Sequence, residues 1–255
     1  MTDLRHFSLA LFAAVAAGLV TFFTGSAEPV GLAVLLPLLG LGLLAATRGA
    51  WTPMSATIAI GLGVILTLHV WPGFHNPPIW QDRHFCADCR AHSLYLSLDQ
   101  ALLVVAWLPL LIGRWRPTRA WNTLAAGVAT ITAAIALGIA TGLFRWQPGW
   151  PGTSLLTMFA VANLVTVAAE ELLFRGLLQR HLLRPLGPFH AWWLTALIFG
   201  LAHLPFGIEF AIVATAAGLG YGWIAWQSGS LWPAIALHWL VNLLHFSLFS
   251  YPMLA

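Results

Sequence analysis

Residues 153–178 read TSLLTMFAVANLVTVAAEELLFRGLL, and this stretch decides which class of fold the chain can have. Its apolar part is long enough to cross a bilayer, because a membrane-spanning helix needs about 20 apolar residues. The same stretch also carries Glu170, Glu171 and Arg175. Ionisable residues are costly inside a membrane, so we treat them as a functional-site hypothesis.

The composition of the whole chain agrees with a membrane protein. Of its 255 residues, 60% are hydrophobic and only 7% are charged, whereas a soluble domain has roughly 25% charged residues. A water-soluble globular protein is therefore excluded. The eleven positive charges are all Arg and nearly all lie between apolar runs, so we relate the net charge of +3 to membrane orientation. We expect no nucleic-acid partner, because the sequence has no basic strip with interleaved aromatic residues.

We expect an all-α fold, a polytopic transmembrane helical bundle with about eight or nine spans. The candidate spans are approximately residues 8–25, 29–46, 53–71, 96–113, 120–144, 153–178, 191–208, 210–227 and 231–250. The first run could instead be a cleaved signal peptide, because it follows Arg5 and precedes Gly25-Ser26-Ala27. We interpret it as a retained span.

The chain shows no internal repeat and no soluble domain, and its longest polar stretch is the loop around residues 72–95. One membrane domain is the economical interpretation. Within it, residues 1–150 form N-terminal transmembrane helices of unassigned role, and residues 151–255 form the core that carries the ionisable motifs.

The distribution of Arg predicts the orientation of the chain. With a cytoplasmic N-terminus, seven Arg fall on inside segments and three on outside loops, in agreement with the positive-inside rule. The inside set is Arg5, Arg48, Arg114, Arg116, Arg119, Arg180 and Arg184, and the outside set is Arg83, Arg90 and Arg145. We expect an integral, multi-pass protein of the bacterial inner membrane, with the loop 72–95 outside and the loop 179–190 in the cytoplasm.

The outside loop contains the two cysteines of the chain, Cys86 and Cys89, in a C-x-x-C pair. A disulfide could persist there, because the outside is an oxidising compartment. Plain thiols are an alternative, and so is a zinc site, since His84 and His92 flank the pair and supply suitable ligands.

Three of the last spans carry ionisable residues well inside their predicted ends. At 1.5 Å per residue, Glu170 lies about 12 Å, His203 about 18 Å and His238 about 10 Å from the cytoplasmic end of its span. Spans of alternating direction thus bring polar groups to a similar level. A shared cavity that faces the cytoplasm would explain this agreement.

Helical spacing assigns roles within the sixth span. Glu170 and Glu171 are 100° apart on a helix, so they cannot both face one small cavity. Glu171 and Arg175 are at i,i+4 and can form an ion pair. We therefore expect Glu170 to be the working carboxylate and the other two to be structural. Asn163 extends the polar face, and we expect it to make a plain interhelical hydrogen bond.

Similar spacing groups the polar residues of the other spans. His238 and Asn242 are at i,i+4 and share a face, and Phe199 lies one turn before His203. His245 shares the face of His238 but lies nearer the outer end of the span, where we expect a satisfied or interfacial histidine. Small residues at positions 214, 218 and 222 predict a ridge that another helix can approach closely.

These residues resemble the CAAX protease and bacteriocin-processing family of intramembrane endopeptidases, abbreviated CPBP or Abi and similar to type II CAAX prenyl endopeptidases. The family shows a Glu-Glu-x-x-x-Arg motif, then Phe-x-x-x-His, then His-x-x-x-Asn on successive membrane helices. Here the three motifs stand at residues 170–175, 199–203 and 238–242. The resemblance covers roughly residues 153–250, and the first 150 residues match nothing that identifies a substrate.

The resemblance implies peptide-bond hydrolysis by a water that a glutamate activates. Glu170 would be the base, while His203, His238 and Asn242 would hold the water and stabilise the oxyanion. Glu171, Arg175 and Phe199 would support this site structurally. Glu170, His203 and His238 would also make a zinc set of two histidines and one glutamate, and members of the family have been described both as metalloproteases and as glutamate proteases. We favour catalysis that requires no cofactor and keep zinc as the alternative.

The resemblance also implies the partners, which are membrane lipid and a protein or peptide substrate at the membrane. That substrate could be a prenylated C-terminus, a leader peptide or a C-terminal sorting segment, and the sequence does not choose among them. Two other functions remain open. One is a proton-coupled transporter that uses Glu170 and the histidines as a relay, and the other is a catalytically silent immunity or scaffold member of the same family.

Overall fold

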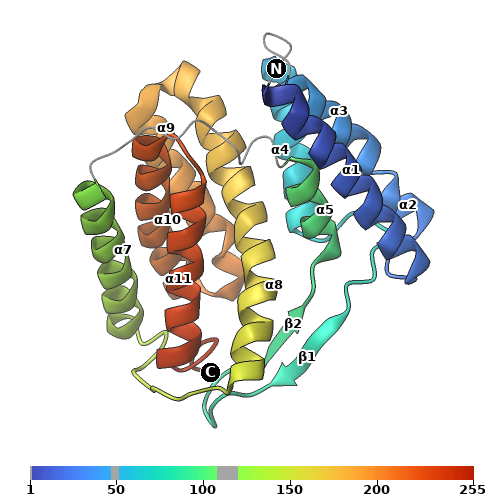
Figure 1. The fold of residues 1–255 in the computed structure, drawn as a ribbon. Coiled ribbons are helices and arrows are strands. Elements are labelled where there is room, and N and C mark those ends of the chain that lie inside the picture. Colours follow the sequence, from blue (N-terminus) through green and yellow to red (C-terminus); the bar gives the residue numbers. More distant parts are fainter. Residues whose placement is uncertain (1, 47–51, 108–119) are drawn as a thin grey trace.

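A computed structural model describes residues 2–46, 52–107 and 120–255 of the chain, and their helices form a bundle with one small β-hairpin at its end (Figure 1). The predicted all-α class is confirmed. Three of the described helical segments are long and apolar enough to cross a membrane, namely Asn122–Ala140, Thr153–Ala202 and Ile208–Ser228. The segments Phe7–Phe23, Pro29–Leu44 and Pro53–Thr67 are shorter apolar helices.

The N-terminal helices pack together on one side of the bundle (Figure 1). They are α1 (Thr2–Phe23), α2 (Pro29–Leu32), α3 (Leu35–Ala46), α4 (Pro53–Thr67) and α5 (Leu98–Ala106). The first run is helical as expected, and its Ala10 and Ala14 are fully buried. Trp107, just after α5, donates its indole N–H to the Leu38 carbonyl at 2.9 Å, so a buried polar contact ties α5 to α3.

The C-terminal helices form the other side. They are α7 (Ala120–Ala140), α8 (Thr153–Glu171), η1 (Leu172–Gln179), α9 (Arg180–Ala202), η2 (Leu204–Phe206), α10 (Ile208–Ser228) and α11 (Trp232–Leu248). The segment η1 is a π-helix, a wide form that often occurs at functional sites. Residues 108–119, which include the end of the predicted span 96–113 and three inside Arg residues, lie outside the described residues, as do residues 47–51 with Arg48.

The predicted loop at residues 179–190 is wrong, because the chain there is helical. The helix runs from η1 into α9 and bends at Gly187, whose φ of +74° is readily adopted only by glycine. Pro185 and Pro188 flank this bend, and their missing N–H groups weaken the helix at the same point. The two predicted spans on either side are thus joined by a kinked helix.

The loop 72–95 contains a β-hairpin that the sequence reasoning did not predict. Strand β1 (Pro78–Arg83) pairs antiparallel with β2 (His92–Tyr95), and the Trp80 indole N–H donates to His92 Nδ1 at 3.1 Å. Cys86 and Cys89, between the strands, form a disulfide. Of the alternatives left open, the disulfide is therefore confirmed.

The hairpin end of the bundle is closed by three segments that we call the end strap: the disulfide loop 84–92, the connection 143–150 and the C-terminal tail 249–255. Backbone hydrogen bonds join them, from Arg90 N–H to Met253 O at 3.0 Å and from Leu254 N–H to Leu143 O at 2.9 Å. An exposed Arg145–Asp88 ion pair adds a side-chain link. The tail is thereby held against residues far earlier in the chain.

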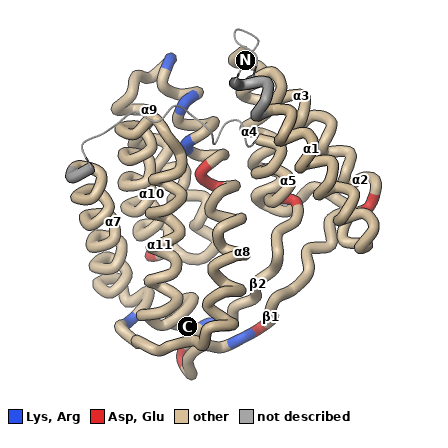
Figure 2. The backbone as a smooth tube through the Cα atoms, in the orientation of Figure 1, with Lys and Arg blue, Asp and Glu red and all other residues tan. Residues whose placement is uncertain are grey.

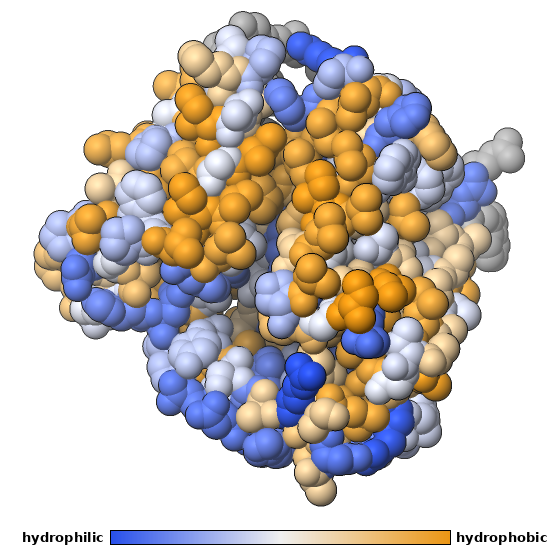
Figure 3. Space-filling model, turned by 180° about the vertical axis from the view of Figure 1, so that it is seen from behind, coloured by the Kyte–Doolittle hydropathy of each residue, from blue (hydrophilic) through white to orange (hydrophobic). Residues whose placement is uncertain are grey.

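The surface of the molecule is that of a membrane protein. Figure 2 shows the middle of the bundle almost free of charged residues, apart from an acidic segment near the upper end of α8. Figure 3 shows broad hydrophobic areas over the rear face and hydrophilic residues gathered at its lower end. Large apolar side chains such as Phe12, Leu36 and Met54 are more than two-thirds exposed, which is expected where lipid and not water surrounds them.

Candidate active site

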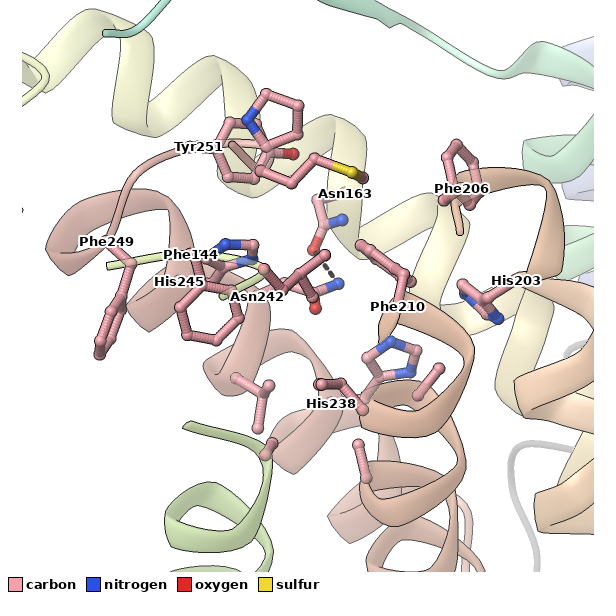
Figure 4. A pocket seen from close by; sticks show the side chains of 18 of the residues that line it. Phe144, Asn163, His203, Phe206, Phe210, His238, Asn242, His245, Phe249 and Tyr251 are labelled. Carbon is pink, nitrogen blue, oxygen red and sulfur yellow. Dashed lines mark hydrogen bonds between the residues drawn. The ribbon is translucent and has the colours of Figure 1, made fainter. Parts of the chain in front are cut away.

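The ionisable residues of the last spans line one cavity of about 540 Å³. Glu170 comes from α8, His203 from the end of α9, and His238 and Asn242 from α11, and all four are among its lining residues. Figure 4 shows the labelled side chains of this group around the cavity, together with aromatic rings. The shared cavity that was expected from the depths of these residues is therefore present.

Glu170 and His238 face each other across α8 and α11. Glu170 Oε2 lies 3.8 Å from His238 Nε2, and the two side chains are only 16% and 7% exposed. The two helices run in opposite directions (Figure 1). A buried carboxylate and a buried imidazole thus share one wall of the cavity.

Glu171 has a second role that sequence reasoning missed. Its Oε1 accepts from Arg175 Nη1 at 2.9 Å, which is the expected i,i+4 ion pair, and also from His238 Nδ1 at 2.9 Å. Since a carboxylate can only accept, the Nδ1 of His238 carries a proton, and its Nε2 faces Glu170. Glu171 therefore fixes the tautomer and the orientation of His238. No local spacing could reveal this contact, because the partners are 67 residues apart.

Arg175 is buried among polar and aromatic neighbours. Its Nη2 donates to the Gly218 carbonyl at 3.0 Å, and its guanidinium carbon lies 4.5 Å from the centre of the Phe199 ring. A side chain at Gly218 would have its Cβ 3.2 Å from Arg175 Nη2, so the predicted small-residue ridge allows this approach. Phe199 thus supports the site through the cation of the structural ion pair.

His203 lines the cavity but does not hydrogen-bond to Glu170. Its Nδ1 donates to the Phe199 carbonyl at 2.8 Å, and its ring stacks on Phe210 at 5.6 Å. The Nε2 of His203 is therefore left free of this bond. Within the part of the chain that the structure describes, no group of three His, Cys, Asp or Glu side chains lies close enough to hold a metal ion.

Asn242 is partly engaged by the opposite helix. Its Nδ2 donates to Asn163 Oδ1 at 3.2 Å (Figure 4), so Asn163 makes the interhelical hydrogen bond that was expected. The amide group has two N–H donors, and one remains for a ligand in the cavity. Tyr221, which sequence reasoning did not single out, stacks its ring on His238 at 4.4 Å and restricts the imidazole from the side of α10.

The cavity lies nearer the hairpin end of the bundle than the η1 end. Residues of the end strap line the cavity, among them His92 and Met253, whereas no residue of η1 does. Figure 1 places the hairpin and the kinked end of α9 at opposite ends of the bundle. The side of the membrane that the cavity faces stays a prediction. Depth arithmetic could place the residues at one level, but it could not show which connections line the cavity.

The fold and the site together define a helical membrane protein with a buried carboxylate–imidazole centre. Residues 152–244 match the family model described as type II CAAX prenyl endopeptidase Rce1-like, so this part of the chain is similar to that protease family. The resemblance inferred from the three motifs is confirmed. No curated protein and no solved structure matches the chain.

Proposed function

We propose that the protein is an intramembrane endopeptidase that cleaves a peptide or protein tail with a glutamate-activated water. The observation that carries this proposal is the facing pair of Glu170 and His238 in a largely apolar cavity, on a domain that matches a protease family. Membrane lipid and a tail that is prenylated, a leader or a C-terminal sorting segment are the proposed partners.

The geometry divides the work among the side chains. A water beside Glu170 and His238 would give one proton to the Glu170 carboxylate while its oxygen attacks the scissile carbonyl. The oxyanion that forms would accept from the free N–H of Asn242. Glu170 would then return the proton to the leaving nitrogen as the C–N bond breaks. His203 and His238, whose Nδ1 atoms are already engaged, would hold the water through Nε2.

We propose that no metal takes part, because an amide such as Asn242 is a poor zinc ligand and a suitable oxyanion donor. The alternative is zinc held by Glu170, His203 and His238, which are ligand types that zinc accepts. Zinc would act there by polarising the carbonyl and the water.

The test of the proposed function uses Glu170→Gln, which keeps the side-chain volume and removes the base. Purified protein in lipid vesicles would be given three quenched-fluorescent peptides: an S-farnesyl-cysteine peptide, a leader peptide and a C-terminal sorting segment. We expect wild type to cleave at least one of them and the variant to be at least about 100-fold slower. Glu209→Gln, at an exposed position outside the cavity lining, is the matched control and should keep the wild-type rate.

Equal rates for wild type and Glu170→Gln would remove the proposed mechanism, and a carrier or a silent family member would show no cleavage in either.

The same preparations also test for metal. In a Cys86→Ser/Cys89→Ser background, we expect no stoichiometric zinc, activity that survives chelation, and lost turnover in His203→Ala. About one zinc per chain that leaves with His203 and takes the activity with it would favour the metal alternative.

A further inference from the structure

His245 has a buried nitrogen that the proposed chemistry does not use. Its ring lines the cavity, and its Nε2 is buried without a hydrogen-bond partner. The expectation of a satisfied histidine is therefore wrong for this atom. Because a buried polar atom without a partner loses the hydrogen bonds it had in water, such an atom calls for an explanation.

The neighbours of His245 in the cavity wall are aromatic. Phe144 lies at 4.5 Å and Tyr251 at 5.2 Å between ring centres, and Phe249 packs against the same cluster at 6.4 Å. The imidazole is therefore a polar group on an apolar wall (Figure 4). A ligand that fills this part of the cavity would meet these aromatic rings together with the imidazole of His245.

His245 continues a polar stripe that begins at the proposed catalytic pair. On α11 the stripe is His238, Asn242 and His245, at spacings of four and three residues, which keep to one helix face. On α8 a second stripe of Glu170, Thr166 and Asn163 also lines the cavity. The contacts Glu170–His238 and Asn163–Asn242 join the two stripes in register.

The length of the stripe matches a short extended peptide. His245 follows His238 by seven residues, which is about 10.5 Å along a helix at 1.5 Å per residue. An extended chain advances about 3.3 Å per residue. His245 is thus about three peptide units away from the point where His238 faces Glu170.

We propose that His245 is a positioning residue that hydrogen-bonds a peptide group of the substrate about three residues from the scissile bond. The substrate would lie extended along the stripe, from the Glu170–His238 pair toward the end strap. A peptide group suits either tautomer of the ring, because it offers both an N–H donor and a C=O acceptor. The apolar side chains of the substrate would pack against the aromatic surface around His245. The inference rests on the proposed function.

The experiment compares peptides of different length. The panel peptide that wild type cleaves would be shortened one residue at a time from each end, down to two residues beyond the scissile bond. For wild type, one of the two series should lose roughly threefold to tenfold in kcat/KM at the step from three residues to two, the size of one hydrogen bond. In His245→Phe, which keeps an aromatic ring, kcat/KM should not fall when the peptide is shortened from three residues to two.

Two further variants separate positioning from folding. His245→Gln restores a polar group at a similar reach and should regain most of the length dependence. His190→Phe changes an exposed histidine outside the cavity lining. It should show the same loss in kcat/KM as wild type when the peptide is shortened from three residues to two. If cleavage depends on Glu170, but kcat/KM falls equally in wild type and His245→Phe at the step from three residues to two, the proposed role of His245 is overturned and the proposed function stands. Cleavage that does not depend on Glu170 would instead overturn the proposed function.

Discussion

Glu171 holds two partners with a single carboxylate oxygen, because Oε1 accepts from both Arg175 and His238. The ion pair is fully buried, with both side chains 0% exposed. Removing one member of such a pair leaves an uncompensated buried charge, whereas removing both can be nearly neutral. Residue 171 therefore links the stability of the bundle to the orientation of the proposed catalytic imidazole.

This linkage predicts different outcomes for stability and activity. Glu171→Gln leaves the Arg175 charge unpaired and should lower the free energy of unfolding by about 3 kcal/mol. The double variant Glu171→Gln/Arg175→Met removes both charges and should recover much of that loss, measured by thermal unfolding in detergent. Cleavage should stay at least about tenfold below wild type in both, because His238 loses its charged orienting partner. Recovery of activity together with stability would contradict the orienting role of Glu171.

At the scale of elements, the hairpin carries a partly buried histidine at its contact with the tail. His92 Nδ1 accepts from Trp80, and its Nε2 lies 3.3 Å from the Tyr251 hydroxyl. Burial lowers the pKa of His92 from 6.5 to about 4. Between these values the unfolded hairpin binds more protons than the folded one. The stability from this group is therefore complete above pH 6.5 and is lost as the pH falls toward 4.

We predict that the end strap loosens in mild acid. At pH 5 the strap should be less stable than at pH 7.5 by about 1–2 kcal/mol, seen as faster hydrogen exchange in residues 78–95 and 249–255. The Asp88–Arg145 pair should not contribute, because Arg145 holds the pKa of Asp88 below its ordinary 3.8. His92→Phe should remove the pH response. An equal response in that variant would assign it to another group.

The helices and the site differ in how far the sequence could predict them. The spans predicted at 210–227 and 231–250 became Ile208–Ser228 and Trp232–Leu248, because the length of an apolar run is a local property. The i,i+4 pair of Glu171 and Arg175 is local in the same sense. The contact of Glu171 with His238, the hairpin register and the unpaired Nε2 of His245 depend on tertiary packing, which no spacing along one helix contains.

At the scale of the whole molecule, the two ends of the bundle are not equivalent. The end strap lines the cavity, whereas the η1 end contributes no lining residue. On the proposed function, a substrate segment bound along the cavity would therefore lie between Glu170 and the end strap. With the N-terminus in the cytoplasm, as proposed from the distribution of Arg, the end strap would be on the outer side of the membrane.

Labelling of single cysteines can test this arrangement. In the Cys86→Ser/Cys89→Ser background, Ser93→Cys probes the hairpin end of the bundle and His190→Cys probes the kinked end of α9. A maleimide that cannot cross the membrane should label the first only from outside intact cells and the second only after the membrane is opened. Labelling of both from one side would contradict the arrangement of the ends, and exchanged sides would reverse the proposed orientation.

The end strap also sets the order in which the protein can be completed during its synthesis. His92 and Tyr251, which meet in the strap, are 159 residues apart, and the hairpin leaves the ribosome long before the tail. His238 and Asn242 are likewise supplied by α11, long after Glu170 has been synthesised. A nascent chain that does not yet include α11 therefore lacks one wall of the cavity. On the proposed function, such a chain could not yet cleave a substrate.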